Sequence, residues 1–154
     1  MTRILAIDPG TTQSGLVNYE AGIQGSGVMD NDHILRHVAE ADWAEVLAVE
    51  MIASYGMPVG AEVFETCVYI GELKRAWELK GGRFLRVYRK DVKMHLCGTP
   101  RAKDPNIRQA LIDLIGPPGT KREPGPTFGV KSHAWAALGV AVTADAMLAG
   151  KIAA

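Results

Sequence analysis

Three side chains that can hold a metal ion stand where predicted strands end or a predicted helix begins. Asp8 closes the apolar run at residues 3–8, Glu50 closes the run at 45–50, and His133 falls in the first turn of the last predicted helix. A carboxylate that closes an apolar strand is partly desolvated, so it needs a cation or hydrogen bonds to stay ionised. Two such carboxylates at one edge of a sheet repel each other unless a divalent cation lies between them. Their oxygen atoms suit Mg²⁺ or Mn²⁺ rather than zinc.

Each of these three residues also has a simpler explanation. Asp8 precedes Pro9 and Gly10, so it can be an ordinary turn residue. Glu50 can be a strand-end carboxylate in water, and His133 can be a helix N-terminal residue that binds nothing. Their occurrence together, in this order of elements, favours one shared site over three separate explanations.

Charge is unevenly distributed along the chain, although the formal net charge is zero. Residues 1–70 hold two basic and ten acidic side chains, whereas residues 71–131 hold fourteen basic and six acidic ones. This asymmetry predicts a polyanion-binding surface in the middle of the chain and a carboxylate-rich site in its first part. The alternative is that the charges are scattered over solvated faces, where most charged side chains lie.

The apolar pattern predicts ten elements that would position these groups. Strands are expected at residues 3–8, 14–19, 23–29, 45–50 and 83–87. Helices are expected at 33–41, 60–80, 92–96, 105–114 and from 132 to about 148, with Asp91, Asp104 and Ser132 as caps of the last three. A loop rich in proline and glycine fills residues 116–129. Trp77 and Trp135 fall on apolar helix faces, which is typical of core residues.

Length and composition place the chain in a broad class. The 154 residues, 47% of them hydrophobic, fit one α/β domain over residues 1–154. Cys67 and Cys97 are too few and too isolated for a disulfide framework or a zinc site, so reduced thiols and a cytoplasmic location are expected. No apolar run approaches the ~18 residues of a membrane span, so we expect no membrane partner.

Four segments, taken in order, resemble the RuvC-type Holliday junction resolvases, in the form seen in phage-type members. They are ILAIDPGTTQSGLV at 4–17, LAVE at 47–50, VKMHLCGTPRAKDPNIRQAL at 92–111 and GVKSHAWAALGVAVTAD at 129–145. The resemblance implies an RNase H-like fold, with a five-stranded mixed sheet flanked by helices. It implies a homodimeric endonuclease of DNA recombination and repair that nicks opposing strands of a four-way DNA junction. If the protein is phage-encoded, it would act in the host cytoplasm.

The resemblance also assigns roles to the three candidate residues. Asp8, Glu50 and His133 would be catalytic and would hold Mg²⁺ or Mn²⁺, two ions per site in the family, with Asp8 between them. The family commonly has a second ligand three residues after the first one in the last helix. This sequence has Ala136 there, so a carboxylate is missing and the second ion is in doubt.

The basic middle of the chain corresponds to the family's DNA-facing segment. Its side chains would neutralise phosphates, chiefly for positioning. The residues expected to contact DNA are Arg89, Lys90, Lys93, Arg101, Lys103 and Arg108. Tyr55, in the loop after Glu50, would either stack on bases at the junction centre or pack on the protein surface.

Two other functions are compatible with parts of the sequence. One is a non-catalytic relative that binds branched DNA and in which Ala136 has ended cleavage. The other is a phosphate-binding fold like that of sugar and acetate kinases, since IDPGTT at 7–12 is similar to their phosphate-binding hairpin. Those kinases need two lobes, and this chain is too short for two.

Overall fold

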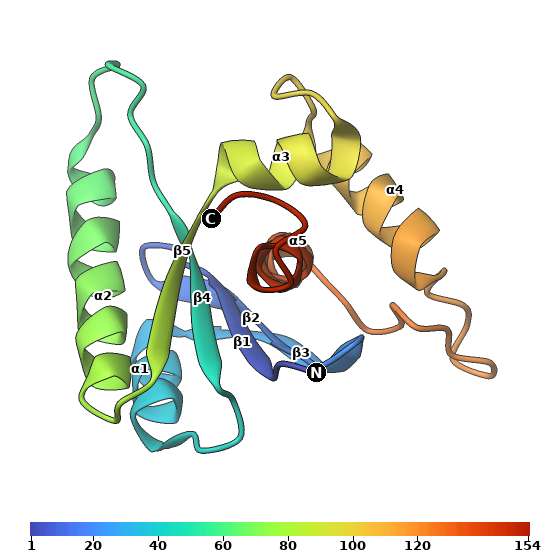
Figure 1. Ribbon diagram of the computed structural model, residues 1–154, viewed down its shortest axis with the longest axis horizontal. Coiled ribbons are helices and arrows are strands. Elements are labelled where there is room, and N and C mark those ends of the chain that lie inside the picture. Colours follow the sequence, from blue (N-terminus) through green and yellow to red (C-terminus); the bar gives the residue numbers. More distant parts are fainter.

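One mixed sheet of five strands, in the order β3-β2-β1-β4-β5, runs through the protein (Figure 1). The computed structural model covers residues 1–154. Strand β1 pairs antiparallel with β2 and parallel with β4, and β4 pairs parallel with β5. The strands are β1 (Ile4–Asp8), β2 (Gln13–Tyr19), β3 (Ile23–Asp30), β4 (Val46–Met51) and β5 (Arg83–Tyr88). All five predicted strands are confirmed, with ends that shift by one residue at most.

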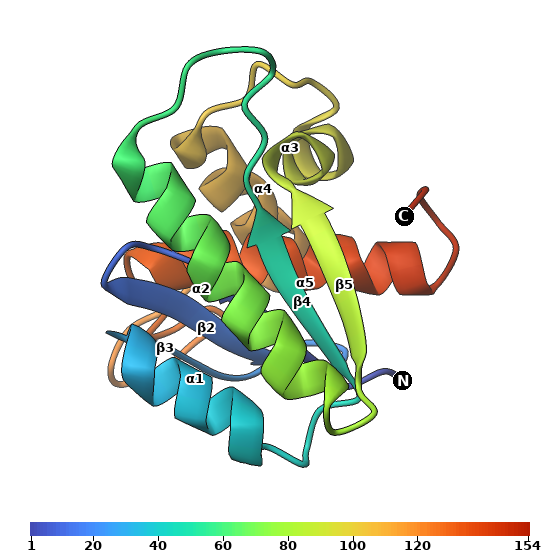
Figure 2. The same cartoon turned by 90° about the vertical axis from the view of Figure 1, so that its left-hand side faces the viewer.

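Helices cover both faces of this sheet (Figures 1 and 2). On one face lie α1 (Asn31–Glu40) and α2 (Ala61–Glu78). On the other lies α5 (His133–Leu148), and α3 (Arg89–Cys97) and α4 (Asp104–Ile115) pack over α5. The five-stranded mixed sheet flanked by helices is therefore as expected.

Alternating side chains of the strands build a separate core on each face. In β1, Ile4 and Ala6 pack with α3, α4 and α5, whereas Leu5 and Ile7 pack with α1 and α2. The same alternation holds in β4. Because side chains of a strand alternate with a period of two, Asp8, which follows Ile4 and Ala6, belongs to the face that α5 covers.

Three helices begin earlier than predicted, and their first turns explain why. At α1, Asp30 is the cap, because its side chain accepts a hydrogen bond from the His33 backbone N–H. At α3, Asp91 lies in the first turn and accepts from the Tyr88 backbone N–H, so it is not the cap. At α4, Asp104 is not the cap either, because it is the first helical residue, one position after the cap Lys103.

Helix α5 is buried on almost every side, since it lies between the sheet and helices α3 and α4. Its first turn comes very close to β2. A Cβ atom built on Gly15 would lie 2.2 Å from the carbonyl oxygen of His133. Only glycine permits this approach, which fixes where α5 begins relative to the end of β1.

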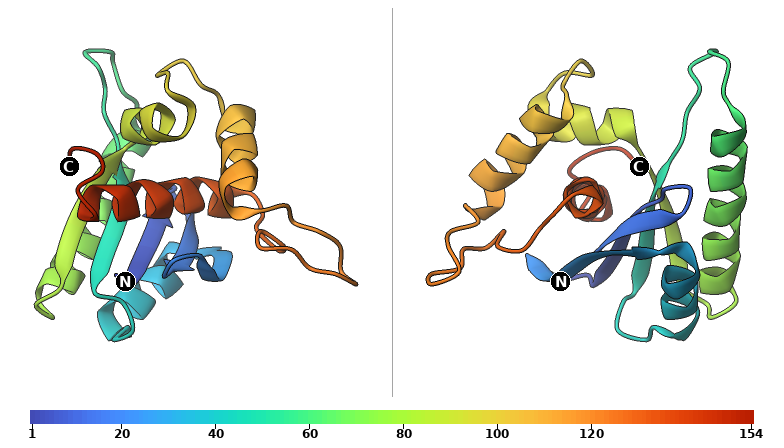
Figure 3. Two further views of the ribbon diagram at one scale, coloured as in Figure 1. Left: turned by 45° about the vertical axis from the view of Figure 1, so that its right-hand side comes forward. Right: turned by 180° about the vertical axis from the view of Figure 1, so that it is seen from behind.

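Two long connections extend from this framework. The segment between α4 and α5 extends well away from the sheet (Figure 3), with one isolated bridge between Gly119 and Pro124. The loop between β4 and α2 extends beyond the end of the sheet (Figure 2). Midway along this loop, Tyr55 and Gly56 form a turn. None of the helices combines the length and hydrophobicity that crossing a membrane requires.

We predict that Gly15→Ala destabilises the protein by about 1–3 kcal/mol, because the added methyl group must push the first turn of α5 away from β2. Urea denaturation measures the change. Gly27→Ala in the neighbouring strand β3 is the matched control, since a Cβ there would meet nothing within 4 Å. Equal effects of the two substitutions would contradict the close approach.

Candidate functional site

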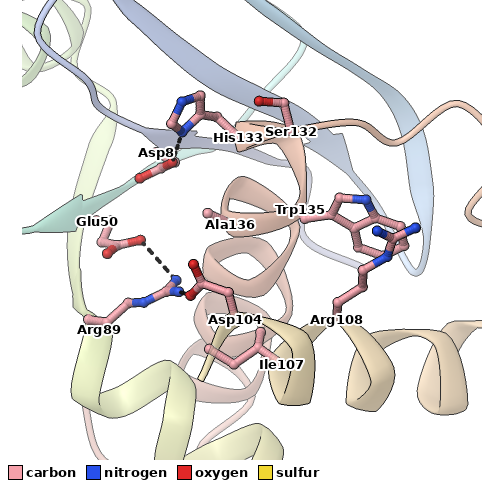
Figure 4. Close-up of a pocket in the computed structure, with 10 residues that line it drawn as sticks. All are labelled: Asp8, Glu50, Arg89, Asp104, Ile107, Arg108, Ser132, His133, Trp135 and Ala136. Atoms are coloured by element: carbon pink, nitrogen blue, oxygen red, sulfur yellow. Dashed lines mark hydrogen bonds and ion pairs between the residues drawn. The ribbon is translucent and has the colours of Figure 1, made fainter. Parts of the chain in front are cut away.

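The edge where β1 and β4 end brings Asp8 and Glu50 to the same side of the sheet. The two strands are parallel neighbours, with Ile7 opposite Val49. Asp8 lies beside His133, the first helical residue of α5, whereas the Glu50 carboxylate points toward Arg89 (Figure 4). Both acidic residues are largely buried, each with 17% of its side chain exposed. The three side chains predicted to share a site thus lie around one pocket of about 350 Å³.

Two separate sets of polar contacts border the carboxylates in this pocket (Figure 4). His133 Nδ1 lies 3.2 Å from Asp8 Oδ2. On the opposite side, Arg89 Nη1 lies 3.8 Å from Glu50 Oε2. The other terminal nitrogen of Arg89 donates to Asp104 Oδ1. Histidine and arginine therefore flank the two buried carboxylates.

Burial makes both carboxylates harder to ionise. Desolvation, and after it the nearby charge of Asp8, raise the pKa of Glu50 to about 7, although Arg89 opposes the rise. Desolvation also raises the pKa of Asp8, against the lowering effect of His133. Oε2 of Glu50 is buried and has no hydrogen-bond partner. The two carboxylates therefore have too little positive charge beside them to stay ionised without a further cation.

A divalent cation fits this deficit, although no three His, Cys, Asp or Glu side chains converge closely enough to form a complete protein cage for a metal. Mg²⁺ is commonly held by one or two carboxylates, with waters and substrate phosphates filling the remaining positions. Asp8, Glu50 with its unpartnered Oε2, and His133 offer such a partial donor set.

The backbone just before His133 is strained. Ser132 has φ 49° and ψ −128°, in a region that favours glycine. It is the N-cap residue of α5, as predicted, but its side chain makes no capping hydrogen bond. Ser132 instead lines the pocket. Ala136, one turn into α5, also lines the pocket, and it presents a methyl group where the family pattern has a ligand.

The residues predicted to contact DNA divide into three groups. Arg89 and Arg108 line the site pocket itself. Lys90, Lys93 and Tyr55 line a second pocket next to it, which shares Arg89. Arg101 and Lys103 are exposed on the connection between α3 and α4 and line neither pocket.

Asp104 and Trp135 are among the pocket residues that the sequence did not predict as site residues. Asp104 was expected only to cap a helix, and an acid before a proline is typical of a helix start, so no signal identified it. Trp135 was expected in the core. It is only partly buried, and its ring lies 4.8 Å from the guanidinium carbon of Arg108 at the pocket.

We predict that Glu50→Gln stabilises the protein at high pH, when no divalent cation is present. The folded state keeps the proton on Glu50 up to a pKa of about 7, whereas an unperturbed glutamate loses it near 4.5. Wild-type stability should therefore fall as pH rises through this window, and neutral glutamine should avoid that loss. The gain should reach up to about 3 kcal/mol at pH 8 and vanish below pH 4.5.

Urea denaturation at pH 4 and pH 8 in a chelating buffer measures this difference. Glu40→Gln at the exposed end of α1 is the control and should change little at either pH. A gain from Glu50→Gln that does not depend on pH would show that the carboxylate is not held in its protonated form.

Comparison with known proteins shows the fold. No family model and no curated protein matches the sequence. The structure of RuvC from Thermus thermophilus is similar over 97% of this chain and 96% of its own, with a TM-score of 0.72 and 21% identity. T. thermophilus RuvC in complex with a Holliday junction substrate is similar over 93% of this chain and 92% of its own, with a TM-score of 0.73 and 19% identity. The chain therefore has the RNase H-like α/β fold, as expected.

Proposed function

We propose that this protein is an endonuclease dependent on Mg²⁺ or Mn²⁺ that resolves four-way DNA junctions. The observation that carries the proposal is the pair of buried carboxylates, Asp8 and Glu50, beside a basic pocket, with Glu50 Oε2 accepting no hydrogen bond. The structural likeness to T. thermophilus RuvC, one form of which holds a Holliday junction substrate, supports the substrate class. Phosphodiester hydrolysis fits this site, because the carboxylates would hold a divalent cation and the neighbouring basic side chains would bind phosphates.

The donor atoms for the cation would be the carboxylates of Asp8 and Glu50 together with His133. A divalent cation bound there would lower the pKa of a bound water and offset charge on the phosphate. His133 can donate from Nδ1 to Asp8, which leaves Nε2 free to accept a proton or a cation. The sheet and α5 shield the carboxylates from bulk water. Because the local dielectric constant is therefore lower, the carboxylates attract a bound cation more strongly than they would in water.

The basic residues beside the site would hold the DNA backbone. Arg89, Lys90 and Lys93 form a cationic wall next to the carboxylates. Arg101, Lys103 and Arg108 extend this charge along the α3–α4 connection and α4. Phosphate contacts of this kind position the duplex arms without reading sequence.

Tyr55 would stack on bases at the junction. It stands at the tip of a tight turn, with φ 51° at Tyr55 and 78° at Gly56, closed by a hydrogen bond from Met57 N–H to Ser54 O. The residue is 68% exposed and lines the basic pocket. An exposed aromatic ring held in a strained turn next to cationic side chains is suited to base stacking.

We predict that Asp8→Asn lowers cleavage of a synthetic four-way junction by more than about a hundredfold, because the cation loses a charged ligand. Junction binding should stay within about twofold, since it depends on the basic residues. Gel assays with Mg²⁺ and Mn²⁺ on junction, flap and linear duplex measure both. Asp42→Asn, exposed before β4 and far from the site, is the control.

A protein that binds the junction but cuts no substrate with either metal would be the non-catalytic alternative, which Ala136 favours. Cleavage by Asp8→Asn at the wild-type rate would contradict the site.

We further propose that residues 1–154 form a single nuclease domain that works as a homodimer. Helix α2 turns Ile70 and Leu73 toward the sheet but leaves Phe64 and Val68 each 62% exposed. An apolar groove between α1 and α2 lies beside them. A second copy of the chain would cover this face and would supply the second active site that two opposing nicks require. The free thiols Cys67 and Cys97 fit a protein that acts on DNA in the reducing cytoplasm.

We predict that Phe64→Glu converts the dimer to a monomer, since a buried unpaired charge is costly at an apolar interface. Sedimentation equilibrium at micromolar concentration measures the mass. Leu114→Glu on α4 is the matched control, because Leu114 is also 62% exposed but lies away from α2, and it should leave the dimer intact. A monomeric wild type would contradict the dimer.

A further inference from the structure

A cationic side chain stands inside the candidate site. Arg89, the first residue of α3, has one terminal nitrogen near Glu50 and donates from the other to Asp104, the first residue of α4 (Figure 4). Its side chain is 28% exposed, so it borders the pocket that a substrate would enter. The guanidinium is thus fixed between two carboxylates from different elements.

The opposite wall of the pocket lacks a ligand for a second metal. Ala136 faces the pocket with a methyl group, one turn after His133. No three metal-binding side chains converge anywhere in the protein. Two divalent cations side by side would therefore have few protein ligands, and one of them would lie close to the positive charge of Arg89.

We propose that the nuclease proposed above binds a single divalent cation, and that Arg89, positioned by Asp104, supplies the second positive charge at the scissile phosphate. The proposal rests on the proposed function. Guanidinium is planar and has five N–H donors, so it can donate to Asp104 from one edge and to non-bridging phosphate oxygens from another. It remains protonated throughout, so it can neutralise charge that develops on the phosphate.

Asp104 is suited to positioning because it is outside the buried pair. Its side chain is 83% exposed, whereas that of Glu50 is 17% exposed. A cation bound to Glu50 would repel Arg89, whose Nη1 lies 3.8 Å from Glu50 Oε2 and makes no hydrogen bond to it. Asp104 would then hold Arg89 at the edge of the pocket, toward the phosphate. Helices α3 and α4 pack against each other, so the pair is anchored at both ends.

The number of Mn²⁺ ions bound without DNA tests the proposal directly. Electron paramagnetic resonance of free Mn²⁺ should give one ion per protomer, lost in Asp8→Asn, and two ions in Ala136→Asp, which restores a carboxylate on the same helix face. Two ions per protomer in the unchanged chain would overturn the single-cation site and leave the nuclease function standing. If Mn²⁺ does not bind, or binds equally well to Asp8→Asn, the nuclease function itself is contradicted.

Arg89→Gln should change metal binding and cleavage in opposite directions. Removing a positive charge beside Glu50 should tighten Mn²⁺ binding by about tenfold at low salt. Junction cleavage at saturating metal should fall by about a hundredfold, because the phosphate loses a cationic donor. Arg3→Gln is the control, since Arg3 pairs with Glu45 at the far end of β1. Weaker Mn²⁺ binding in Arg89→Gln, or unchanged cleavage, would overturn the proposal.

Asp104 should act mainly through Arg89. Asp104→Asn should weaken Mn²⁺ binding by about threefold, because Arg89 turns to Glu50, and should slow cleavage by about tenfold. Asp104→Glu should restore most of both. In the Arg89→Gln background, Asp104→Asn should weaken Mn²⁺ binding by much less, because only the direct attraction between Asp104 and the cation is then lost. Asp113→Asn, exposed near the end of the same helix, is the control. An equal loss of Mn²⁺ affinity in both backgrounds would make Asp104 a direct ligand and overturn its positioning role.

Discussion

Two like charges buried at one edge of the sheet are the constraint around which the site is organised. Asp8 and Glu50 come from neighbouring parallel strands, and desolvation together with their mutual repulsion holds the pKa of Glu50 near 7. Carboxylates in this position cost stability unless positive charge lies close by. Two side chains that reach the pocket reduce that cost, because His133 lies within hydrogen-bonding distance of Asp8 and Arg89 lies beside Glu50. The pocket also leaves an open position that suits a divalent cation.

The helices that supply His133 and Arg89 are placed by close packing rather than by polar contacts. Gly15 lets the start of α5 come close to β2, and this determines the distance between His133 and Asp8. The strained backbone at Ser132 lies at the same point, where the chain turns from the long connection into the helix. Strain of this kind persists only where the surrounding packing holds it. The buried helix α5 provides that packing, so the site and the core depend on the same contacts.

Much of this arrangement could be predicted from local sequence. Asp8 and Glu50 close apolar runs, and parallel strands end at a common edge, so their proximity follows from the strand pattern. His133 follows from the start of the last apolar helix. Asp104 could not be found this way, because an acid at a helix start has an ordinary local explanation. Its contact with Arg89 depends on the angle at which α4 crosses α3, which no periodicity encodes. Trp135 packs against the core as expected, but it is only partly buried and also borders the pocket beside Arg108 of α4, which local sequence does not reveal.

The position of Ala136 shows why the number of ligands and the number of positive charges should be considered together. In the nuclease proposed above, a site with one carboxylate fewer would hold fewer cations, yet the phosphate to be cleaved would carry the same charge. An arginine anchored on a neighbouring helix can meet that need without metal, because it carries its charge permanently and needs only a carboxylate to orient it. Arg89 and Asp104 meet both conditions from outside α5. Under the proposed function, alanine at position 136 is therefore compatible with cleavage, because α3 and α4 place a cationic side chain across the same pocket.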